Sequence, residues 1–348
     1  MNKYIIKDKE IKYPIIQGGM GVGVSLEKLA GAVAAAGGIG IISAAFPGFK
    51  DKDFDKDFKK TNHNALIRQI NEAKAQKDQG LVGVNIMVAM TDYEDLVHAA
   101  VEAKADIIIS GAGLPLNLPG LVSDPEIILC PVVSTGRVAK LLCKKWDKTY
   151  NVIPDMLIIE GPEAGGHLGY EKNHLDVDIY DLLADVKESI VVFEEKYNRK
   201  IPIYIGGGIF DENDVKHALD SGADGVVLGT RFIATYECDA DDTFKQLIID
   251  CKQDDIQIVK SPVGMPGRAL KTPLVKKLET QNIPVTKCFN CLVPCDVKTT
   301  PYCIAQALMD AANGDIDNGL FFVGAKAYKI NEMTSVKELI TTLFSKVK

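Results

Sequence analysis

Short, almost wholly apolar runs alternate along the chain with longer segments of helical pattern. The runs hold few of the alternating polar residues that mark a half-exposed strand; residues 156–159, for example, read MLII. Continuous apolar strands are typical of parallel sheets that are covered on both faces. Eight such runs are predicted to be strands: 14–17, 40–43, 81–87, 106–110, 127–134, 156–159, 201–205 and 225–228.

Helical patterns fill many of the intervals between these runs. We expect Ser25 to cap the first helix and Gly222 to end the last one before residue 230. Repeated strand-then-helix units predict an α/β fold of the closed (β/α)8 TIM barrel type. A doubly wound sheet would more often begin with a dinucleotide-binding fingerprint, and the chain has neither G-x-G-x-x-G nor a Walker A sequence. The clearest predicted helices cover residues 25–36, 65–77, 93–104, 179–197 and 212–221.

The pattern changes after Cys251. Prolines at positions 262, 266, 273 and 284 interrupt the next segment, and four cysteines crowd into the stretch from Cys288 to Cys303. A (β/α)8 barrel takes about 250 residues, whereas the chain has 348. We therefore predict a barrel at residues 1–251 and a C-terminal extension at 252–348, which packs on the barrel, covers the mouth of its site and ends in a helix near 335–345.

Charge and terminal sequence narrow the class of protein. The net charge of −7 argues against a nucleic-acid partner. The first residues contain no apolar core of a signal peptide, which predicts a cytoplasmic location. Residues 29–46 carry no charge, but Gly37 and Gly38 break the stretch, so we expect a buried helix, turn and strand rather than a membrane span.

A glycine-rich loop after the sixth predicted strand delivers one histidine. Residues 160–169 read EGPEAGGHLG, and barrel enzymes hold their catalytic groups at such strand ends. Because its neighbours are small, His167 can project into a cleft, where an imidazole of ordinary pKa suits a general base. The other histidines lie in helical or polar surroundings and are expected at the surface: His63, His98, His174 and His217.

Glycines also end the last two predicted strands. Residues 206–208 and the pair Gly229 and Thr230 each precede a helix, so their backbone N–H groups can close on a phosphate. The usual phosphate site of these barrels lies after the same two strands. One histidine beside a phosphate cradle suggests a nucleotide-type cofactor that faces a general base.

Three further positions could contact such a cofactor, and each has an ordinary structural alternative. The first strand ends at Gly19, Met20 and Gly21, a turn without bulk that suits a flat ring or is a plain tight turn. The Asn85 side chain offers a hydrogen-bond donor and an acceptor to a heterocycle, or it makes hydrogen bonds to the backbone of a loop. Glu160 could accept a hydrogen bond from a hydroxyl or a ring N–H, or form a salt bridge.

The cysteine-rich stretch follows the spacing C-x2-C-x3-C-x7-C. Four thiolates in one short loop suit a zinc ion or an iron–sulphur cluster, and a reduced compartment makes disulfides the weaker explanation. Free thiols are the alternative. The candidate metal ligands are Cys288, Cys291, Cys295 and Cys303, while Cys130, Cys143, Cys238 and Cys251 are interpreted as core-filling residues.

Six motifs between residues 13 and 236 carry a family resemblance. In order they read QGGMG, VNIM, SGAG, EGPEAGGHLG, IGGGI and VLGTRF. This order resembles the nitronate monooxygenase (2-nitropropane dioxygenase) family of FMN-dependent TIM barrels, and it is also similar to the flavin-dependent enoyl-acyl-carrier-protein reductase II group. The resemblance implies that the barrel binds FMN and that His167 is the catalytic base beside it. Many family members have Gln in place of Glu160, which leaves that contact open.

The resemblance also implies a set of cofactor-binding residues. Gly208 and residues 227–230 would hold the phosphate. The ring edge would lie near Gly19, Met20, Asn85, Glu160 and Gly165. The full set is Gly19, Met20, Gly21, Asn85, Glu160, Gly165, Gly166, Gly207, Gly208, Val227, Leu228, Gly229 and Thr230.

Three functions remain open on the sequence. The first is FMN-dependent oxidation of alkyl nitronates, such as propionate 3-nitronate, by dioxygen to a carbonyl compound and a nitrogen oxide. The second is an enoyl-acyl-carrier-protein reductase that contains FMN and takes electrons from NAD(P)H; the lack of a strongly basic patch favours the first. The third is a barrel that binds a phosphorylated ligand without redox chemistry. We expect a small-molecule substrate, with dioxygen or NAD(P)H as the redox partner. We expect no membrane partner. A homodimer is one of the assemblies that the sequence leaves open.

Overall fold

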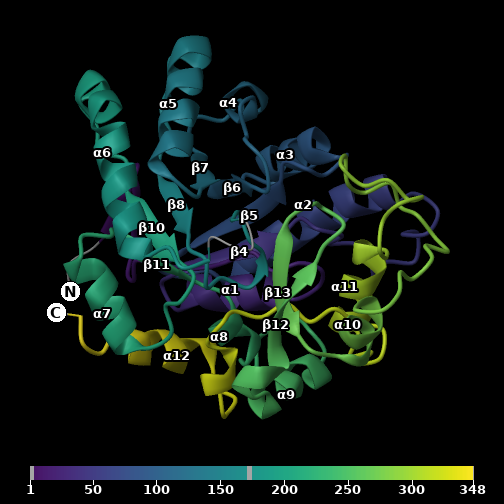
Figure 1. Ribbon diagram of the computed structural model, residues 1–348. Helices are drawn as coiled ribbons and strands as arrows, with labels where there is room; N and C mark the ends of the chain where they lie inside the picture. The colour runs from purple at the N-terminus through teal and green to yellow at the C-terminus, as the bar shows by residue number, and fades with distance from the viewer. Residues whose placement is uncertain (1–3, 171–174, 348) are drawn as a thin grey trace.

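The computed structural model describes residues 4–170 and 175–347, and its centre is a closed barrel of eight parallel strands (Figure 1). Neighbours around the barrel follow the order β10-β11-β3-β4-β5-β6-β7-β8. All eight predicted strands and the TIM barrel are confirmed. The strands are β3 (Ile15–Gln17), β4 (Ile39–Ser43), β5 (Leu81–Met87), β6 (Ile107–Gly111), β7 (Ile128–Val133), β8 (Leu157–Glu160), β10 (Ile203–Gly206) and β11 (Gly225–Leu228).

Apolar side chains fill the barrel at the end where its strands begin. Ile16, Ile39 and Tyr204 belong to one buried cluster there. A short hairpin that precedes the barrel, β1 (Tyr4–Ile6) and β2 (Lys9–Ile11), adds Ile6 and Ile11 to the same cluster. Because this end is packed shut, a ligand can enter only at the opposite end, where the strands finish.

Helices surround the barrel and confirm the alternating pattern. The first helix begins later than predicted, because the Ser25 hydroxyl is bonded to the turn after β3: the Met20 N–H donates to Ser25 Oγ at 2.8 Å. The amides of that helix are instead satisfied by Asp239, which accepts from Leu26 N–H at 2.8 Å. The helices are α1 (Glu27–Ala35), α2 (Phe58–Gln76), α3 (Tyr93–Glu102), α4 (Leu118–Leu121), α5 (Gly136–Tyr150), α6 (Ile179–Tyr197), α7 (Glu212–Asp220), α8 (Thr230–Ile233) and α9 (Asp242–Asp250).

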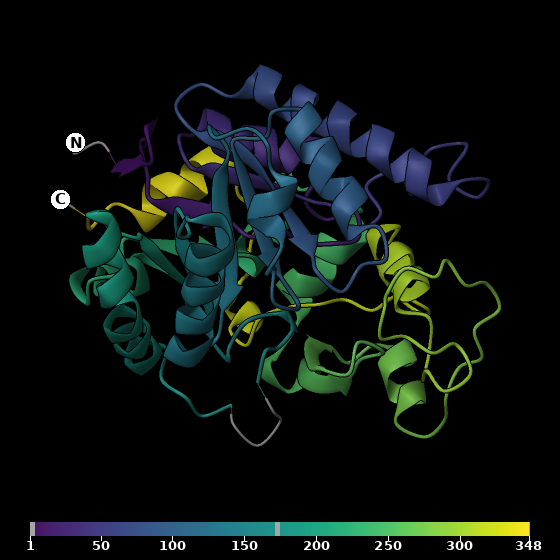
Figure 2. The same cartoon turned by 90° about the horizontal axis from the view of Figure 1, so that it is seen from above.

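The C-terminal part packs on the barrel, as predicted, and adds a small sheet over the loop that carries His167. In this sheet β13 (Pro266–Leu270) pairs with both β12 (Ile256–Lys260) and β9 (Gly166–His167). Helices α10 (Pro273–Leu278) and α11 (Ile304–Ala312) lie on the side of the molecule away from the β1/β2 hairpin (Figure 2). No helix in residues 4–170 or 175–347 combines the length and the apolar character needed to cross a membrane.

The last helix, α12 (Val336–Leu343), returns to the barrel and packs against α1 and α7 (Figure 1). It confirms the helix predicted near 335–345 and is capped by the Ser335 hydroxyl, which accepts from Glu338 N–H at 3.2 Å. Helix α12 therefore completes the ring of helices around the barrel. The division of the chain after residue 251 stays a prediction.

Candidate functional site

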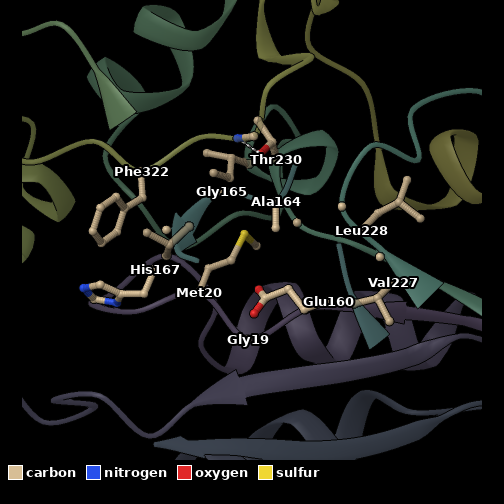
Figure 3. A pocket seen from close by; sticks show the side chains of 18 of the residues that line it. Gly19, Met20, Glu160, Ala164, Gly165, His167, Val227, Leu228, Thr230 and Phe322 are labelled. Carbon is tan, nitrogen blue, oxygen red and sulfur yellow. Dashed lines mark hydrogen bonds between the residues drawn. The ribbon is translucent and has the colours of Figure 1, made fainter. Parts of the chain in front are cut away.

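A cavity of about 320 Å³ lies at the ends of the barrel strands (Figure 3). The structure brings together in its wall every residue that the sequence suggested for the cofactor or for catalysis. Its volume is within the range of about 300–1,000 Å³ typical of small-molecule sites. The residues concerned are Gly19, Met20, Gly21, Asn85, Glu160, Gly165, Gly166, His167, Gly207, Gly208, Val227, Leu228, Gly229 and Thr230.

At one end of the cavity, glycines leave the backbone open. Gly207 and Gly208 have φ angles of 93° and 98°, in the left-handed region that favours glycine. A Cβ atom on Gly207 would stand 2.7 Å from the carbonyl oxygen of Gly161. The turn therefore tolerates no side chain, and its amides remain accessible to an anionic ligand.

Two cations stand beside these glycines, and sequence reasoning did not find either as a site residue. Lys326 donates to the Gly208 carbonyl and to Asp214, whose Oδ2 lies 3.1 Å from Nζ. Arg231 also lines the cavity; its guanidinium lies 4.7 Å from the centre of the Phe210 ring. The Arg231 Nε is buried without a hydrogen-bond partner among the described residues. Positive charge at this end favours a phosphate group.

Thr230 ties this end of the cavity to the C-terminal segment. Its hydroxyl oxygen accepts a hydrogen bond from Gly324 N–H at 2.8 Å, which Figure 3 marks with a dashed line. The Thr230 oxygen can still donate its own hydrogen to a ligand. The motif VLGTRF predicted Thr230, but no local pattern predicted its contact with Gly324.

His167 lies at the other end, in the short strand β9. Its Nε2 is 2.7 Å from the hydroxyl oxygen of Ser261, and its ring stands against Phe322 with 5.1 Å between ring centres. The surrounding protein shields the imidazole from bulk water and lowers its pKa to about 4. The ordinary imidazole pKa expected from the sequence is therefore wrong, because burial disfavours the charged form. At neutral pH the His167 ring is uncharged.

The other histidines are partly as predicted. His98 and His217 are exposed, whereas His63 is half-buried and its Nδ1 is 3.1 Å from Asp95. His174 lies outside the described residues.

Glu160, at the end of β8, stands beside the glycine turn. It pairs in the barrel with Gly206, and its backbone carbonyl accepts the Tyr170 hydroxyl at 2.7 Å. Its carboxyl group makes no hydrogen bond or ion pair with any residue that the structure describes, so the salt-bridge alternative finds no support. Burial raises the pKa of the Glu160 carboxyl to about 7.

The turn after β3 is close to Asn85. A Cβ atom on Gly19 would stand 2.4 Å from the Cβ of Asn85, so glycine is required at that position. The Asn85 side chain lines the cavity and makes no hydrogen bond within residues 4–170 and 175–347. Its amide is therefore free to bind a ligand. The alternative, in which Asn85 makes hydrogen bonds to a loop, finds no support.

Arg268 of β13 holds the glycine-rich loop against the C-terminal segment. Its guanidinium donates to the carbonyl oxygens of Pro162 at 2.7 Å and Ala164 at 2.6 Å. Gly165 packs so closely on this segment that a Cβ atom would be 2.6 Å from the backbone of Val323. No sequence motif marked Arg268 or Ser261; a single polar residue in a proline-rich stretch carries no periodic signal.

The structure does not support the predicted metal site. Among the described residues, no group of three or more His, Cys, Asp or Glu side chains is arranged to hold a metal ion. The cysteine loop is held instead by backbone pairing, with Thr91 N–H donating to the Cys291 carbonyl at 3.1 Å, and by Phe289 in a cluster with Phe46 and Phe54. Burial, together with the nearby thiols of Cys303, Cys295 and Cys288, raises the pKa of the Cys291 thiol to about 12. Of the cysteines interpreted as core-filling, Cys130, Cys143 and Cys238 are buried and Cys251 is half-buried.

Comparisons with known proteins agree with this arrangement. A family model described as nitronate monooxygenase matches residues 2–346. A Mycobacterium tuberculosis protein, (3aS,4S,5R,7aS)-5-hydroxy-7a-methyl-1-oxo-octahydro-1H-indene-4-carboxyl-CoA dehydrogenase, is 28% identical over 270 residues. That match covers 78% of the chain and 66% of the relative, slightly less than two thirds of its length.

Two further proteins are similar over more of their length. A probable nitronate monooxygenase of Bacillus subtilis is 22% identical over 306 residues, with 82% of the chain and 84% of the relative covered. The solved structure of FabK from Thermotoga maritima superposes with a TM-score of 0.74 at 28% identity, over 97% of the chain and 93% of FabK.

Proposed function

Because the chain belongs to the nitronate monooxygenase family, we propose that it is an FMN-dependent oxidoreductase that oxidises alkyl nitronates. Propionate 3-nitronate is a representative substrate, dioxygen is the oxidant, and the products are a carbonyl compound and a nitrogen oxide. A cytoplasmic location and a homodimeric assembly accompany this proposal as predictions.

The residues of the cavity fit FMN. The turn at Gly207 and Gly208, which has no room for a side chain, together with Lys326 and Arg231, suits a phosphate group. The bulk-free turn at Gly19 suits a flat ring, and the unpaired Asn85 amide suits its polar edge. Bound FMN would supply the acceptor for the substrate's electrons and would return them to dioxygen.

The observation that carries the choice of substrate is the uncharged His167 imidazole. A nitronate has already lost its carbon-bound proton and presents only oxygen acceptors, so its oxidation needs no acid, and a neutral imidazole can still orient it through its ring N–H. Reduction of an enoyl thioester needs a proton donor instead, and an imidazole with a pKa of about 4 is deprotonated at neutral pH. His167 therefore suits the oxidative reaction better.

Ser261 is the hydrogen-bond partner of His167. The Ser261 oxygen lies 2.7 Å from His167 Nε2 and also accepts from Val263 N–H at 3.4 Å; with two lone pairs and one hydrogen it can either donate to Nε2 or accept from it. Phe322 packs against the ring. These contacts hold the imidazole in one orientation in the cavity, whichever nitrogen carries the ring proton.

The second candidate is the reduction of an enoyl thioester with electrons from NAD(P)H. The relative from Mycobacterium tuberculosis, which is named for a CoA thioester, favours a substrate of this class. The third candidate, a barrel that binds a phosphorylated ligand without redox chemistry, requires the glycine turn but gives His167 no role.

One set of measurements separates the three candidates. Purified protein should be yellow or become yellow with added FMN, and it should release nitrite from propionate 3-nitronate in air. Oxidation of NAD(P)H that depends on an enoyl thioester, without nitrite release, would replace the proposed reaction with the second candidate. Colourless protein that FMN cannot reconstitute would leave only the third.

A further inference from the structure

The carboxyl group of Glu160 lines the cavity, but the proposed reaction does not use it. It ends β8, lines the cavity, and stands beside Gly206 at the start of the glycine turn. In Figure 3 it points towards Met20, on the side of the picture where His167 also lies. Within the described residues neither carboxyl oxygen has a hydrogen-bond or ion-pair partner.

An unpaired carboxylate in such a place is costly. Transfer of a charge out of water without a compensating partner disfavours the ionised form strongly. Helix α6, which packs on β8, supplies no polar partner for the carboxylate, because its buried residues are all apolar. Burial alone accounts for the raised pKa of Glu160, about 7.

The charged and titratable groups around the cavity leave Glu160 unpaired. Lys326 is engaged by Asp214, and the Tyr170 hydroxyl donates to the backbone of Glu160 rather than to its carboxyl group. The Glu160 charge further raises the pKa of Tyr170, after burial. Besides Tyr170, the groups that share this space are Glu163, His167, Arg231 and Lys326.

We propose that the Glu160 carboxylate takes up one proton when the bound flavin is reduced, and so offsets the negative charge that reduction brings into the cavity. This step presupposes the FMN cofactor of the proposed function. It goes beyond that function, because it assigns a proton-carrying role to a side chain that need not touch the substrate.

Two protons are taken up in this step, one by the cofactor and one by Glu160. Two electrons from the substrate and one proton would add one negative charge to the bound cofactor. A second proton from solvent converts the Glu160 carboxylate to the neutral acid, which can then donate a hydrogen bond. Reoxidation by dioxygen releases both protons with the two electrons. Below pH 7 the carboxyl group is already protonated, so reduction takes up only the first proton.

The experiment is a redox titration of the FMN-loaded protein from about pH 6 to about pH 9, the range that brackets the Glu160 pKa. In wild type the dependence of the midpoint potential on pH should become twice as steep above about pH 7, where Glu160 must be protonated. Glu160→Gln keeps the shape of the side chain without a titratable group and should keep the shallow, one-proton slope throughout. Glu163→Gln removes another carboxyl group of the same cavity and should behave like wild type.

A second measurement needs no variant. Infrared spectra of the wild-type protein, reduced minus oxidised, should show the carbonyl stretch of a newly protonated carboxyl group above pH 7. An unchanged slope in wild type, no such band, or a steep slope that persists in Glu160→Gln would each overturn the proposal.

The outcomes also separate this proposal from the proposed function. The protein could show the steep dependence of midpoint potential on pH and yet release no nitrite from nitronates. That result would overturn the proposed substrate and support the proposed role of Glu160. A chain that binds no FMN would overturn the cofactor assignment and the role of Glu160 together.

Discussion

The cavity has two walls of different character. The barrel wall presents mainly backbone to a ligand, at Gly19, Gly207 and Gly208, where a Cβ atom would collide with neighbouring atoms. The C-terminal wall presents side chains, among them Phe322 and Lys326. The two walls therefore act on a ligand in different ways. Tight turns on the barrel fix where the ligand can lie. The covering segment sets the charge around the ligand, the protonation of nearby side chains and the access of water to the cavity.

The largest effect is expected for Gly207→Ala on the barrel wall. We expect FMN affinity to fall by about 100-fold, because a strained positive φ costs about 1–3 kcal/mol and the added Cβ meets the Gly161 carbonyl. Fluorescence titration of FMN would measure this. Gly264→Ala is the matched control, since Gly264 has a similar φ of 80° but nothing within 4 Å of its Cβ position. Equal losses in both variants would show that strain alone matters.

Of similar size is the effect of His167→Asn, which keeps a hydrogen-bonding side chain and removes the imidazole. Turnover should drop by about 100-fold while FMN stays bound. Steady-state nitrite release and the flavin absorbance of the same sample would report both quantities. His98→Asn, at an exposed histidine, serves as the control. Wild-type turnover in His167→Asn would remove His167 from the chemistry.

Arg268→Met tests how the C-terminal wall holds the glycine-rich loop. The carbonyls of Pro162 and Ala164 would lose their charged donor, which we expect to lower the free energy of unfolding by about 2 kcal/mol. Chemical denaturation with and without FMN would measure the change. Arg68→Met removes an arginine whose guanidinium is hydrogen-bonded to Asp51 at the surface, and should cost much less. If the two variants lose the same stability, the loop contact is unimportant.

A smaller effect, about tenfold in turnover, is expected for Ser261→Ala, because a neutral hydrogen bond to His167 is lost. Ser261→Thr keeps the hydroxyl and should restore most of the rate. The pKa of His167, followed by nuclear magnetic resonance, should move in the Ala variant and return in the Thr variant. A rate loss without any change in that pKa would mean that Ser261 serves only the packing of its hairpin.

The last effects concern stability against pH, where His167 and Glu160 act in opposite directions. The His167 pKa is about 4 in the folded chain and 6.5 in a free imidazole, so its stabilising contribution is present above pH 6.5 and is lost as pH falls towards 4. The Glu160 pKa is about 7 against 4.5, so its contribution is present below pH 4.5 and is lost as pH rises through 7. Denaturation of His167→Gln and Glu160→Gln across this range should show opposite trends relative to wild type. Parallel trends would contradict these assignments.

The sequence by itself determined the barrel and the position of the site in it. A run such as IGIIS in β4 is buried along its whole length, which requires cover on both faces and therefore parallel neighbours. The glycines at strand ends and His167 followed from the same pattern, since chain order places every strand end on one face of a barrel. The start of α2 at Phe58 was missed, because Phe58 is followed by six polar residues, and only Asp57, which accepts from Lys60 N–H, marks it.

Only the tertiary structure decided which distant side chains meet that site and how they titrate. Ser261 lies 94 positions from His167, and Lys326 lies 118 positions from Gly208. Such pairs leave no periodic trace in the sequence, because they depend on how the segment after β11 folds back over the barrel. The pKa values of His167 and Glu160 follow from the burial that this cover creates. Local patterns encode which face of an element is buried, whereas the electrostatics of a cavity arise from everything that closes it.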